Sequence, residues 1–417
     1  MIKEIEPGYL YYEFELPNRG DTNFLNNKNS LTSRALLTIG SAIFEFERYL
    51  KTDKQSRLDI AIDKFWPDTI TKKEIEICLE RFISYVLLSD TKVRLVKKEF
   101  PDDGYINEKE VASVDSVCLF SGGVDSISGV LAQSKHEKIF SVFCSHSHQA
   151  RIVSLVRGFG DNILKRKNIP LYEIAAPAID TTGYAQSRGF LYILSAASVA
   201  NAYAINKVVV SECGPTMFQP KFSPADQVTM TTHPFVIERV SELIKLLKLN
   251  ISIDCPYENR TKAEVMALCP YPILISKSHS CISQRLITHD GTCYGCVIRR
   301  LASLASNIRD TDYAKNPIID NSANSGNLLS VLDFCADYLI DRQNMPMYQI
   351  DLIDQYNKWD LFERFALDNF SALYRIKRRE NLIPAVGRIY ERVRKHFNGT
   401  KIFRDRLQLL KSMKGVA

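Results

Sequence analysis

The pattern of apolar and polar positions divides the chain into three regions. In residues 1 to about 108, strand-like segments alternate with two helix-like segments, near residues 32–50 and 72–89. The strand-like segments are GYLYYEFEL, RLDIAIDKF and KVRLVKKEF. This mixture predicts an N-terminal α+β domain. We find no residue pattern here that indicates a chemical function, and the polar stretch PDDGYINEKEVAS marks the end of the region.

The middle region, from Val114 to about Asn250, has a different period. Five short apolar runs, DSVCLF, IFSVFC, LYEIA, KVVVS and ISIDC, are separated by amphipathic helical patterns. Parallel strands need long connections and are buried on both faces, so this region predicts an α/β fold with a parallel sheet and flanking helices. Beyond Cys296 the patterns are helical and end in a basic tail from Val386. We therefore expect domains at 1–108, 109–310 and 311–417.

Composition narrows the class of protein without deciding its function. The chain has 417 residues, of which 45% are hydrophobic, and its 54 Lys and Arg only slightly exceed its 48 Asp and Glu. This small excess makes no strong case for nucleic acid. No apolar run approaches the roughly 20 residues of a membrane span, and the N-terminal MIKEIEPGYLYYEFEL lacks the apolar core of a signal peptide. We expect a cytoplasmic protein with no membrane partner.

Candidate chemistry first appears directly after the first apolar run of the middle region. The sequence FSGGVDS consists of Phe120, Ser121, Gly122, Gly123, Val124, Asp125 and Ser126. Two glycines let backbone N–H groups approach an anion, the hydroxyls can donate to phosphate, and the aspartate can hold Mg²⁺. The spacing is that of neither a Walker loop nor a dinucleotide fingerprint. A plain capped turn explains one polar residue but not several, so we predict a phosphate-binding loop.

The motif SGGVDS resembles the PP-loop of the ATP pyrophosphatase superfamily, whose members split ATP between its α and β phosphates. Within that superfamily the chain resembles the QueC branch, which makes 7-cyano-7-deazaguanine from 7-carboxy-7-deazaguanine. Three further landmarks agree in order: SRGFL (187–191), DCPYENRTKAE (254–264), and Ser280-Cys281 followed by HDGTCYGCVIRR (289–300). The resemblance covers about Val114 to Ala302. It implies the PP-loop, adenine nucleotide alpha hydrolase-like fold.

The flanking regions resemble a narrower group. Ordinary QueC proteins lack the N-terminal domain, the helical C-terminal part and the segments SECGPTMFQP and TMTTHP. These features are similar to the QueC-like proteins of bacterial anti-phage operons, most of all the QatC family of the Qat system, with a relative in some CBASS operons. This resemblance implies that the activated deazaguanine passes to the N-terminal amine of a protein partner from the same operon rather than to ammonia.

The expected site residues come partly from the resemblance and partly from positions at the carboxyl ends of the predicted strands, where open α/β sheets bind ligands. ATP and Mg²⁺ are expected at the loop, with Asp125, Arg188 and Lys262 as catalytic residues and Ser145 and His146 as further cofactor-binding residues. The expected substrate-binding residues are Gln186, Phe190, Glu212, Thr232 and His233.

Elementary electrostatics supports part of this set. Arg188 and Lys262 stand at predicted helix N-termini, where the helix dipole disfavours cations unless an anion is near, and Thr261 is placed to cap the helix of Lys262. Alternatives remain open, because a solvated loop position explains Glu212 nearly as well, and a helix-capping role explains Thr231, Thr232 and His233 equally well.

The cysteines suggest a metal site. Ten cysteines are too few for a disulfide scaffold of this length, but Cys281, Cys293 and Cys296 are clustered, and a CxxC pair is typical of zinc sites. The resemblance implies a structural Zn²⁺ with a fourth cysteine where this chain has Asp290. Register favours Asp290 over the adjacent His289 as the fourth ligand. The alternative is that the cysteines are buried thiols without metal.

Together these features predict an ATP-dependent amide-forming ligase that acts on 7-carboxy-7-deazaguanine. Three other functions stay open. One is an ordinary 7-cyano-7-deazaguanine synthase that uses ammonia. Another is a tRNA-thiolation enzyme whose cysteines carry persulfide or an iron–sulfur cluster. The last is a nucleotide-binding scaffold without catalysis.

Overall fold

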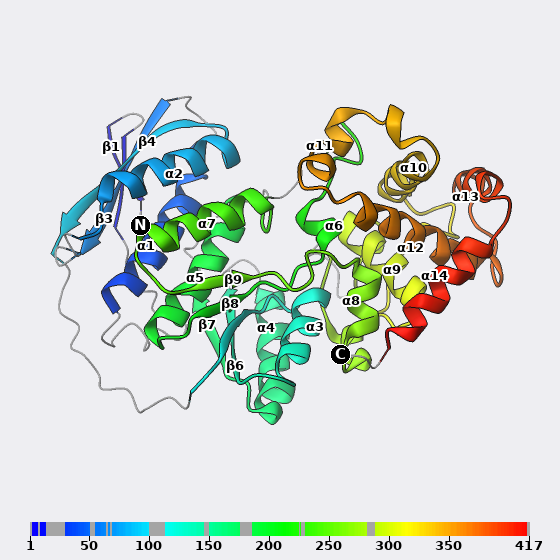
Figure 1. Ribbon diagram of the computed structural model, residues 1–417, viewed down its shortest axis with the longest axis horizontal. Helices are drawn as coiled ribbons and strands as arrows, with labels where there is room; N and C mark the ends of the chain where they lie inside the picture. Colours follow the sequence, from blue (N-terminus) through cyan, green and yellow to red (C-terminus); the bar gives the residue numbers. More distant parts are fainter. Residues whose placement is uncertain are drawn as a thin grey trace. The chain divides into compact units, whose positions relative to one another are not determined.

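The computed structural model describes residues 2–6, 9–13, 30–50, 55–63, 66, 69–99, 113–145, 150–175, 186–224, 226, 230–281 and 288–414. The chain forms two compact units, each built from separate segments (Figure 1). The first unit comprises Met1–Ser121, Gln133–Val210 and Thr229–Cys255, and the second comprises Gly122–Ala132, Ser211–Val228 and Pro256–Ala417. The domain boundaries that the sequence suggests stay predictions.

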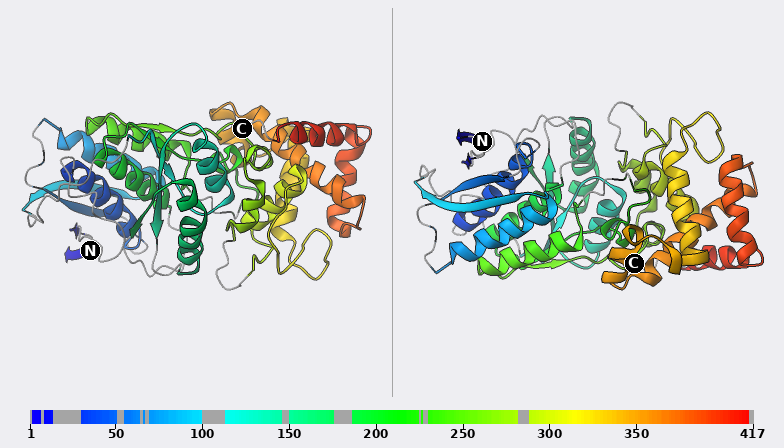
Figure 2. Two further views of the ribbon diagram at one scale, coloured as in Figure 1. Left: turned by 90° about the horizontal axis from the view of Figure 1, so that it is seen from below. Right: turned by 90° about the horizontal axis from the view of Figure 1, so that it is seen from above.

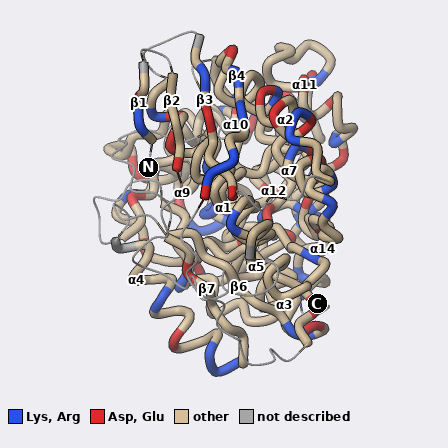
Figure 3. Tube along the Cα trace, turned by 90° about the vertical axis from the view of Figure 1, so that its left-hand side faces the viewer, with Lys and Arg blue, Asp and Glu red and all other residues tan. Residues whose placement is uncertain are grey.

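The first unit contains a four-stranded N-terminal sheet of order β1-β2-β3-β4, and Figure 3 shows the strands side by side. Its strands are β1 (Ile2–Glu6), β2 (Tyr9–Tyr12), β3 (Gln55–Asp63) and β4 (Asp90–Lys98), and its helices are α1 (Ser30–Phe46) and α2 (Lys72–Val86). Strand β1 is antiparallel to β2, whereas β2, β3 and β4 are parallel. Three of the four strands in the expected α+β domain are therefore parallel, with helices between them, and short alternating segments in the sequence do not indicate strand direction.

The second sheet of the first unit is parallel throughout, as the sequence predicts. Its order is β7-β6-β5-β8-β9. The strands are β5 (Ser116–Leu119), β6 (Ile139–Ser145), β7 (Leu171–Ala175), β8 (Lys207–Val209) and β9 (Ser252–Asp254). The chain order reverses between the neighbouring strands β5 and β8. In open α/β sheets, ligands bind beyond the carboxyl ends of the strands at such a point.

Three longer helices and one core complete the first unit. The helices are α4 (Ala150–Phe159), α5 (Arg188–Ala202) and α7 (Pro234–Leu246), with short turns at Gly160–Leu164 and Lys165–Lys167. Helix α5 is buried along most of its length and packs on α1, where Ser198 Oγ donates to the Ser33 carbonyl at 2.8 Å. One hydrophobic cluster extends from Leu10 to Leu247. The N-terminal region is thus part of the core that carries the parallel sheet.

The second unit is helical in its described residues. Its helices are α3 (Val124–Gln133), α6 (Gly214–Met217), α8 (Lys262–Leu268), α9 (Tyr294–Ser306), α10 (Gly326–Asp341), α11 (Met347–Gln355), α12 (Trp359–Lys377), α13 (Pro384–His396) and α14 (Lys401–Ser412), with short turns at Pro272–Lys277 and Arg342–Asn344.

The C-terminal helices pack around α12. Helices α9, α10 and α14 contact α12, and the yellow to red helices lie together in both views of Figure 2. Phe362, Phe365 and Phe370 of α12 are buried. Among the helices that the structure describes, none combines the length and apolar character needed to cross a membrane.

Candidate functional site

The glycine-rich loop has the local structure that the sequence predicts. Phe120 is buried directly after β5, and α3 begins at Val124. Gly122 has φ +74°, in the left-handed region that favours glycine. The N-terminus of α3 therefore follows a glycine turn, an arrangement that presents backbone N–H groups and the positive end of a helix dipole to an anion.

Asp125, in the first turn of α3, forms a buried ion pair with Lys262. Its Oδ2 accepts a hydrogen bond from Lys262 Nζ at 2.6 Å and one from the Cys213 backbone N–H at 3.2 Å. The two charged side chains are only 5% and 15% exposed. Asp125 Oδ1 is buried and has no hydrogen-bond partner among the described residues. The structure therefore brings together two predicted catalytic residues and leaves one buried carboxylate oxygen available for a further ligand.

A second carboxylate lies beside Asp125. One ligand atom from each of Asp125, Glu212 and Cys213 lies within 4.8 Å of the others. Burial and the neighbouring Asp125 charge raise the pKa of Glu212 well above its ordinary value. Burial also raises the pKa of Asp125, but the charge of Lys262 and the hydrogen bonds to the carboxylate together outweigh burial, so the net shift is downward. We define Asp125, Glu212, Cys213 and Lys262 as the carboxylate–lysine cluster. It has two carboxylates for one ammonium group, and oxygen donors of this kind suit Mg²⁺.

The N-terminus of α8 positions Lys262, as predicted. Thr261 caps the helix: its Oγ1 accepts from the Glu264 backbone N–H at 3.2 Å, while the Thr261 N–H donates to Glu264 Oε2 at 3.0 Å. This reciprocal pair is a capping box. The ion pair with Asp125 supplies the anion that a lysine at a helix N-terminus requires.

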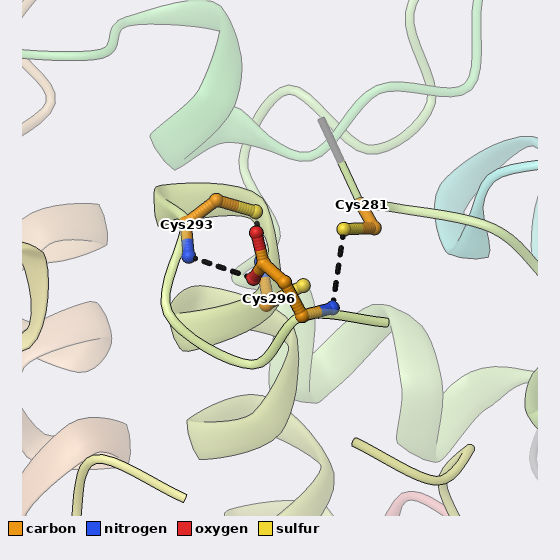
Figure 4. A group of neighbouring side chains, drawn as sticks. Cys281, Cys293 and Cys296 are labelled. Carbon is orange, nitrogen blue, oxygen red and sulfur yellow. Dashed lines mark hydrogen bonds between the residues drawn. The ribbon is translucent and has the colours of Figure 1, made fainter. Parts of the chain in front are cut away.

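The structure also brings together the four residues predicted as metal ligands. One ligand atom from each of Cys281, Asp290, Cys293 and Cys296 lies within 4.8 Å of the others, and Figure 4 shows the cysteine sulfurs close to one another. We call this group the cysteine cluster. Two backbone N–H groups donate to its sulfurs: that of Asp290 to Cys281 Sγ and that of Cys296 to Cys293 Sγ, both at 3.4 Å. Hydrogen bonds of this kind stabilise thiolates that bind metal.

His289 is not part of the cysteine cluster. Its Nε2 accepts from the Ser280 backbone N–H at 3.0 Å and lies 3.4 Å from Arg299 Nη1. By contrast, Asp290 Oδ1 accepts from the Cys293 backbone N–H at 3.0 Å, which holds the carboxylate at the start of α9. The geometry therefore favours Asp290 over His289 as the fourth ligand. Three sulfurs and one carboxylate match the donors of a four-coordinate zinc site.

A short segment connects the cysteine cluster with the glycine-rich loop. The His279 backbone N–H donates to the Gly122 carbonyl at 2.8 Å. The imidazole Nε2 of His279 lies 2.9 Å from the Cys281 carbonyl. A metal ion that fixes Cys281 would therefore also stiffen the strand-to-helix turn at Gly122.

The other predicted residues belong to the first unit, and their part in the same site stays a prediction. Phe190 is buried in the core and packs on Phe82 with ring centroids 4.1 Å apart. Gln186 Oε1 accepts from the Met230 backbone N–H at 3.0 Å. Ser145 and Thr232 are buried.

Two histidines complete this group. His233 caps α7: its Nδ1 accepts from the Phe235 backbone N–H at 3.1 Å, so the capping alternative is confirmed. Burial lowers the pKa of His233 to about 4. His146 lies outside the described residues.

Arg188 begins α5, as predicted, and the anion at this helix end comes from an unexpected residue. The Glu47 carboxylate accepts from the backbone N–H groups of Gln186 and Ser187 at 2.6 and 2.9 Å, and from Ser187 Oγ at 2.7 Å. Arg188 Nε is buried and has no hydrogen-bond partner among the described residues. No sequence motif marks Glu47, because it lies about 140 residues from its partners. The N-terminal region thus contributes an acidic group at the start of α5 that sequence analysis missed.

A scan against protein-family models and a search of curated proteins found no match to the chain. The resemblance to PP-loop enzymes therefore stays a prediction that rests on the sequence motifs.

Proposed function

We propose that the protein is a PP-loop ATP pyrophosphatase that adenylates the carboxylate of 7-carboxy-7-deazaguanine and then forms an amide. The observation that carries the proposal is the carboxylate–lysine cluster. Asp125 and Glu212 are in the segments that follow the neighbouring parallel strands β5 and β8, and Lys262 contacts Asp125 at 2.6 Å. Acidic and basic side chains next to a glycine turn at a helix N-terminus are suited to a nucleotide triphosphate with its divalent cation.

The reaction balances as two displacements. A carboxylate oxygen of the substrate attacks the α-phosphorus of ATP, the bond between that phosphorus and the bridging oxygen of the β-phosphate breaks, and pyrophosphate leaves. An amine then attacks the acyl carbon of the adenylate and AMP leaves, after which the new amide nitrogen loses a proton. ATP is needed because a free carboxylate has no leaving group. No covalent enzyme intermediate is required.

The residues of the cluster have separate roles in this proposal. Lys262 and the N-terminus of α3 bind the phosphates and stabilise the charge that develops on pyrophosphate. Asp125 and Glu212 would hold Mg²⁺, which supplies additional positive charge when bound. The proximity of Glu212 to Asp125, with an unpartnered Asp125 Oδ1, supports a metal-binding role for Glu212 over the contact with the deazaguanine ring expected from sequence.

The cysteine cluster has a structural role in the proposal. Its four donors fit Zn²⁺, and the hydrogen bond from the His279 backbone to the Gly122 carbonyl supports a role in holding the loop rather than in the reaction itself. The acceptor amine rests on the resemblance to anti-phage proteins, which favours the N-terminal amine of an operon partner over ammonia. The same resemblance supports a role in antiviral defence.

The first test is a product assay. Purified protein with ATP, Mg²⁺, 7-carboxy-7-deazaguanine and the operon partner as amine acceptor should release AMP and pyrophosphate in equal amounts, and only when the deazaguanine is present. Formation of ADP, or no turnover with any deazaguanine, contradicts the proposal. Metal analysis should find zinc, whereas iron and sulfide would favour tRNA thiolation.

The second test concerns the acceptor. Intact-mass analysis of a co-expressed operon partner should show an added deazaguanine group at its N-terminus. Efficient formation of the nitrile from ammonium alone would instead identify an ordinary 7-cyano-7-deazaguanine synthase.

A further inference from the structure

The helix that carries Lys262 is held by charged residues of the C-terminal helices. Glu264, in the first turn of α8, is fully buried, and both of its carboxylate oxygens accept from Arg364 Nη1 of α12 at 2.6 Å. Glu264 Oε1 also accepts from Arg406 Nη2 of α14 at 2.8 Å. Two guanidinium groups of the C-terminal helices therefore bind Glu264, one of the two residues of the capping box of α8.

A second buried carboxylate extends this network. Asp368 of α12 is 2% exposed, and its Oδ2 accepts from Thr261 Oγ1 at 2.5 Å. Its Oδ1 accepts from Arg406 Nε at 2.7 Å. Thr261 and Glu264, the two residues of the capping box, thus each bond directly to the C-terminal helices. With Arg364 included, two carboxylates are balanced by two guanidinium groups.

The start of α12 also contacts the segment that carries Glu212. A Cβ atom at Gly214 would lie 2.4 Å from Leu361 Cδ2 and 2.2 Å from the Glu258 carbonyl oxygen, so only glycine permits this approach. The Lys358 ammonium lies 4.6 Å from the ring centroid of Phe218 and 3.6 Å from Glu258 Oε1. Two of the three segments that form the carboxylate–lysine cluster therefore pack against the same helix.

The short length of α8 makes this support necessary. The helix has seven residues, and a helix this short is unstable by itself in water. Its capping box fixes the local turn but not the direction of Lys262 relative to Asp125. That direction depends on the elements against which α8 packs.

We propose that Arg364, Asp368 and Arg406 are positioning residues that hold the first turn of α8 so that Lys262 faces Asp125. The C-terminal extension, in this view, completes the ATP site. None of the three touches a reacting group, so each acts through Lys262. The kcat measurements test this inference only through the proposed function, on which they rest. The hydrogen-exchange measurement does not depend on the proposed function.

The experiment compares two arginine substitutions. Arg364→Gln removes one guanidinium from Glu264, and the Arg364 side chain is 30% exposed, so this variant should fold. The matched control is Arg392→Gln. Arg392 is an exposed residue of α13, and its Nη2 lies 3.0 Å from Asp337 Oδ1 of α10, so this variant also breaks an ion pair between C-terminal helices. We expect kcat for ATP turnover to fall about 10- to 100-fold in Arg364→Gln, as misplacement of a catalytic group by about 1 Å commonly causes, and less than about twofold in the control.

Two further variants separate positioning from loss of folding. Arg364→Lys keeps the charge beside Glu264 and should recover most of kcat. In a Lys262→Met background, Arg364→Gln should add less than about a twofold loss, because the residue acts through Lys262. A full additional loss in that background overturns the proposal. Arg406→Gln serves as a more severe variant, whose fold is checked by circular dichroism.

A measurement without substrate distinguishes the two proposals. Hydrogen exchange of the backbone amides in residues 259–268 should be at least about tenfold faster in Arg364→Gln than in the wild type, and unchanged in Arg392→Gln. If the wild type shows no ATP turnover but the exchange rate rises, the proposed function fails and the positioning role stands. If the wild type turns over ATP while Arg364→Gln keeps full activity and protection, the positioning role is wrong.

Discussion

The cysteine cluster and the carboxylate–lysine cluster belong to the same unit but are assembled in different ways. Three of the four groups in the cysteine cluster, Asp290, Cys293 and Cys296, lie within seven residues, at the start of α9. In the carboxylate–lysine cluster, 137 positions separate Asp125 from Lys262, and Glu212 comes from a third segment. A local turn determines the first cluster, whereas the second depends on how several helices pack.

The two clusters also differ in how their charge is satisfied. Backbone N–H groups donate to two sulfurs and to the carboxylate of the cysteine cluster, so its turn is already shaped around negative charge. In the other cluster a single lysine faces two carboxylates, and burial together with the neighbouring Asp125 charge raises the pKa of Glu212. We infer that the cysteine cluster contributes mainly to stability and the carboxylate–lysine cluster mainly to chemistry.

The largest expected effect comes from removing the Asp125 carboxylate from the carboxylate–lysine cluster. Asp125→Ala should reduce ATP-to-AMP turnover by at least about 1,000-fold, or about 4 kcal/mol, because a metal anchor beside the phosphates is lost. The fold should persist, since Glu212 remains as a counter-ion for Lys262. Pyrophosphate release measures the loss of turnover, and circular dichroism checks that the fold persists. Near wild-type turnover would exclude the PP-loop assignment.

Loss of zinc from the cysteine cluster should reduce the stability of the protein more than its activity. Cys296→Ser should lower the free energy of unfolding by about 3 kcal/mol and reduce bound zinc, measured by denaturant unfolding and elemental analysis. Turnover should fall less than in Asp125→Ala, because the contact of His279 with Gly122 transmits only a loss of rigidity. Wild-type protein that contains no zinc and is equally stable in chelator would show that the cysteines are only buried thiols.

A finer test concerns the unusual ligand. Asp290→Ala should weaken zinc binding about 10- to 100-fold, measured by competition with a chelating dye, because one donor and its hydrogen bonds to the backbone are lost. Asp290→Cys is the matched variant and should bind zinc more tightly than the wild type, since it supplies a fourth thiolate. Equal affinity in all three proteins would remove Asp290 from the site.

The smallest expected effect concerns His233, which belongs to neither cluster. It is a loss of folding stability as the pH falls. Burial lowers the pKa of His233 to about 4, below the ordinary value of 6.5. The unfolded chain therefore binds this proton more readily, so stability is complete above about pH 6.5 and is lost as the pH falls towards 4. The loss between pH 7 and pH 5 should be about 1–2 kcal/mol by denaturant unfolding. His233→Asn keeps a capping group for α7 and should lack this component of the acid dependence.

Several features of the site could be predicted because they depend on neighbours in the sequence. The glycine turn at Gly122, the capping of α8 by Thr261 and the choice of Asp290 over His289 all follow from residue types at fixed short spacings. The parallel sheet was also predictable, because buried strands separated by helices leave few other arrangements. The parallel pairing in the N-terminal sheet was not, since alternating strands of this length fit either direction.

By itself, the sequence determined the local turns, the helix starts and the ligand types, which require only short-range geometry and hydrogen bonding. The tertiary structure decided which distant charges meet. It placed Glu47 at the start of α5, Glu212 beside Asp125, and Arg364 and Arg406 on Glu264. Such pairs leave no pattern in one sequence, because a buried charge needs a partner of opposite sign but does not specify where along the chain that partner lies.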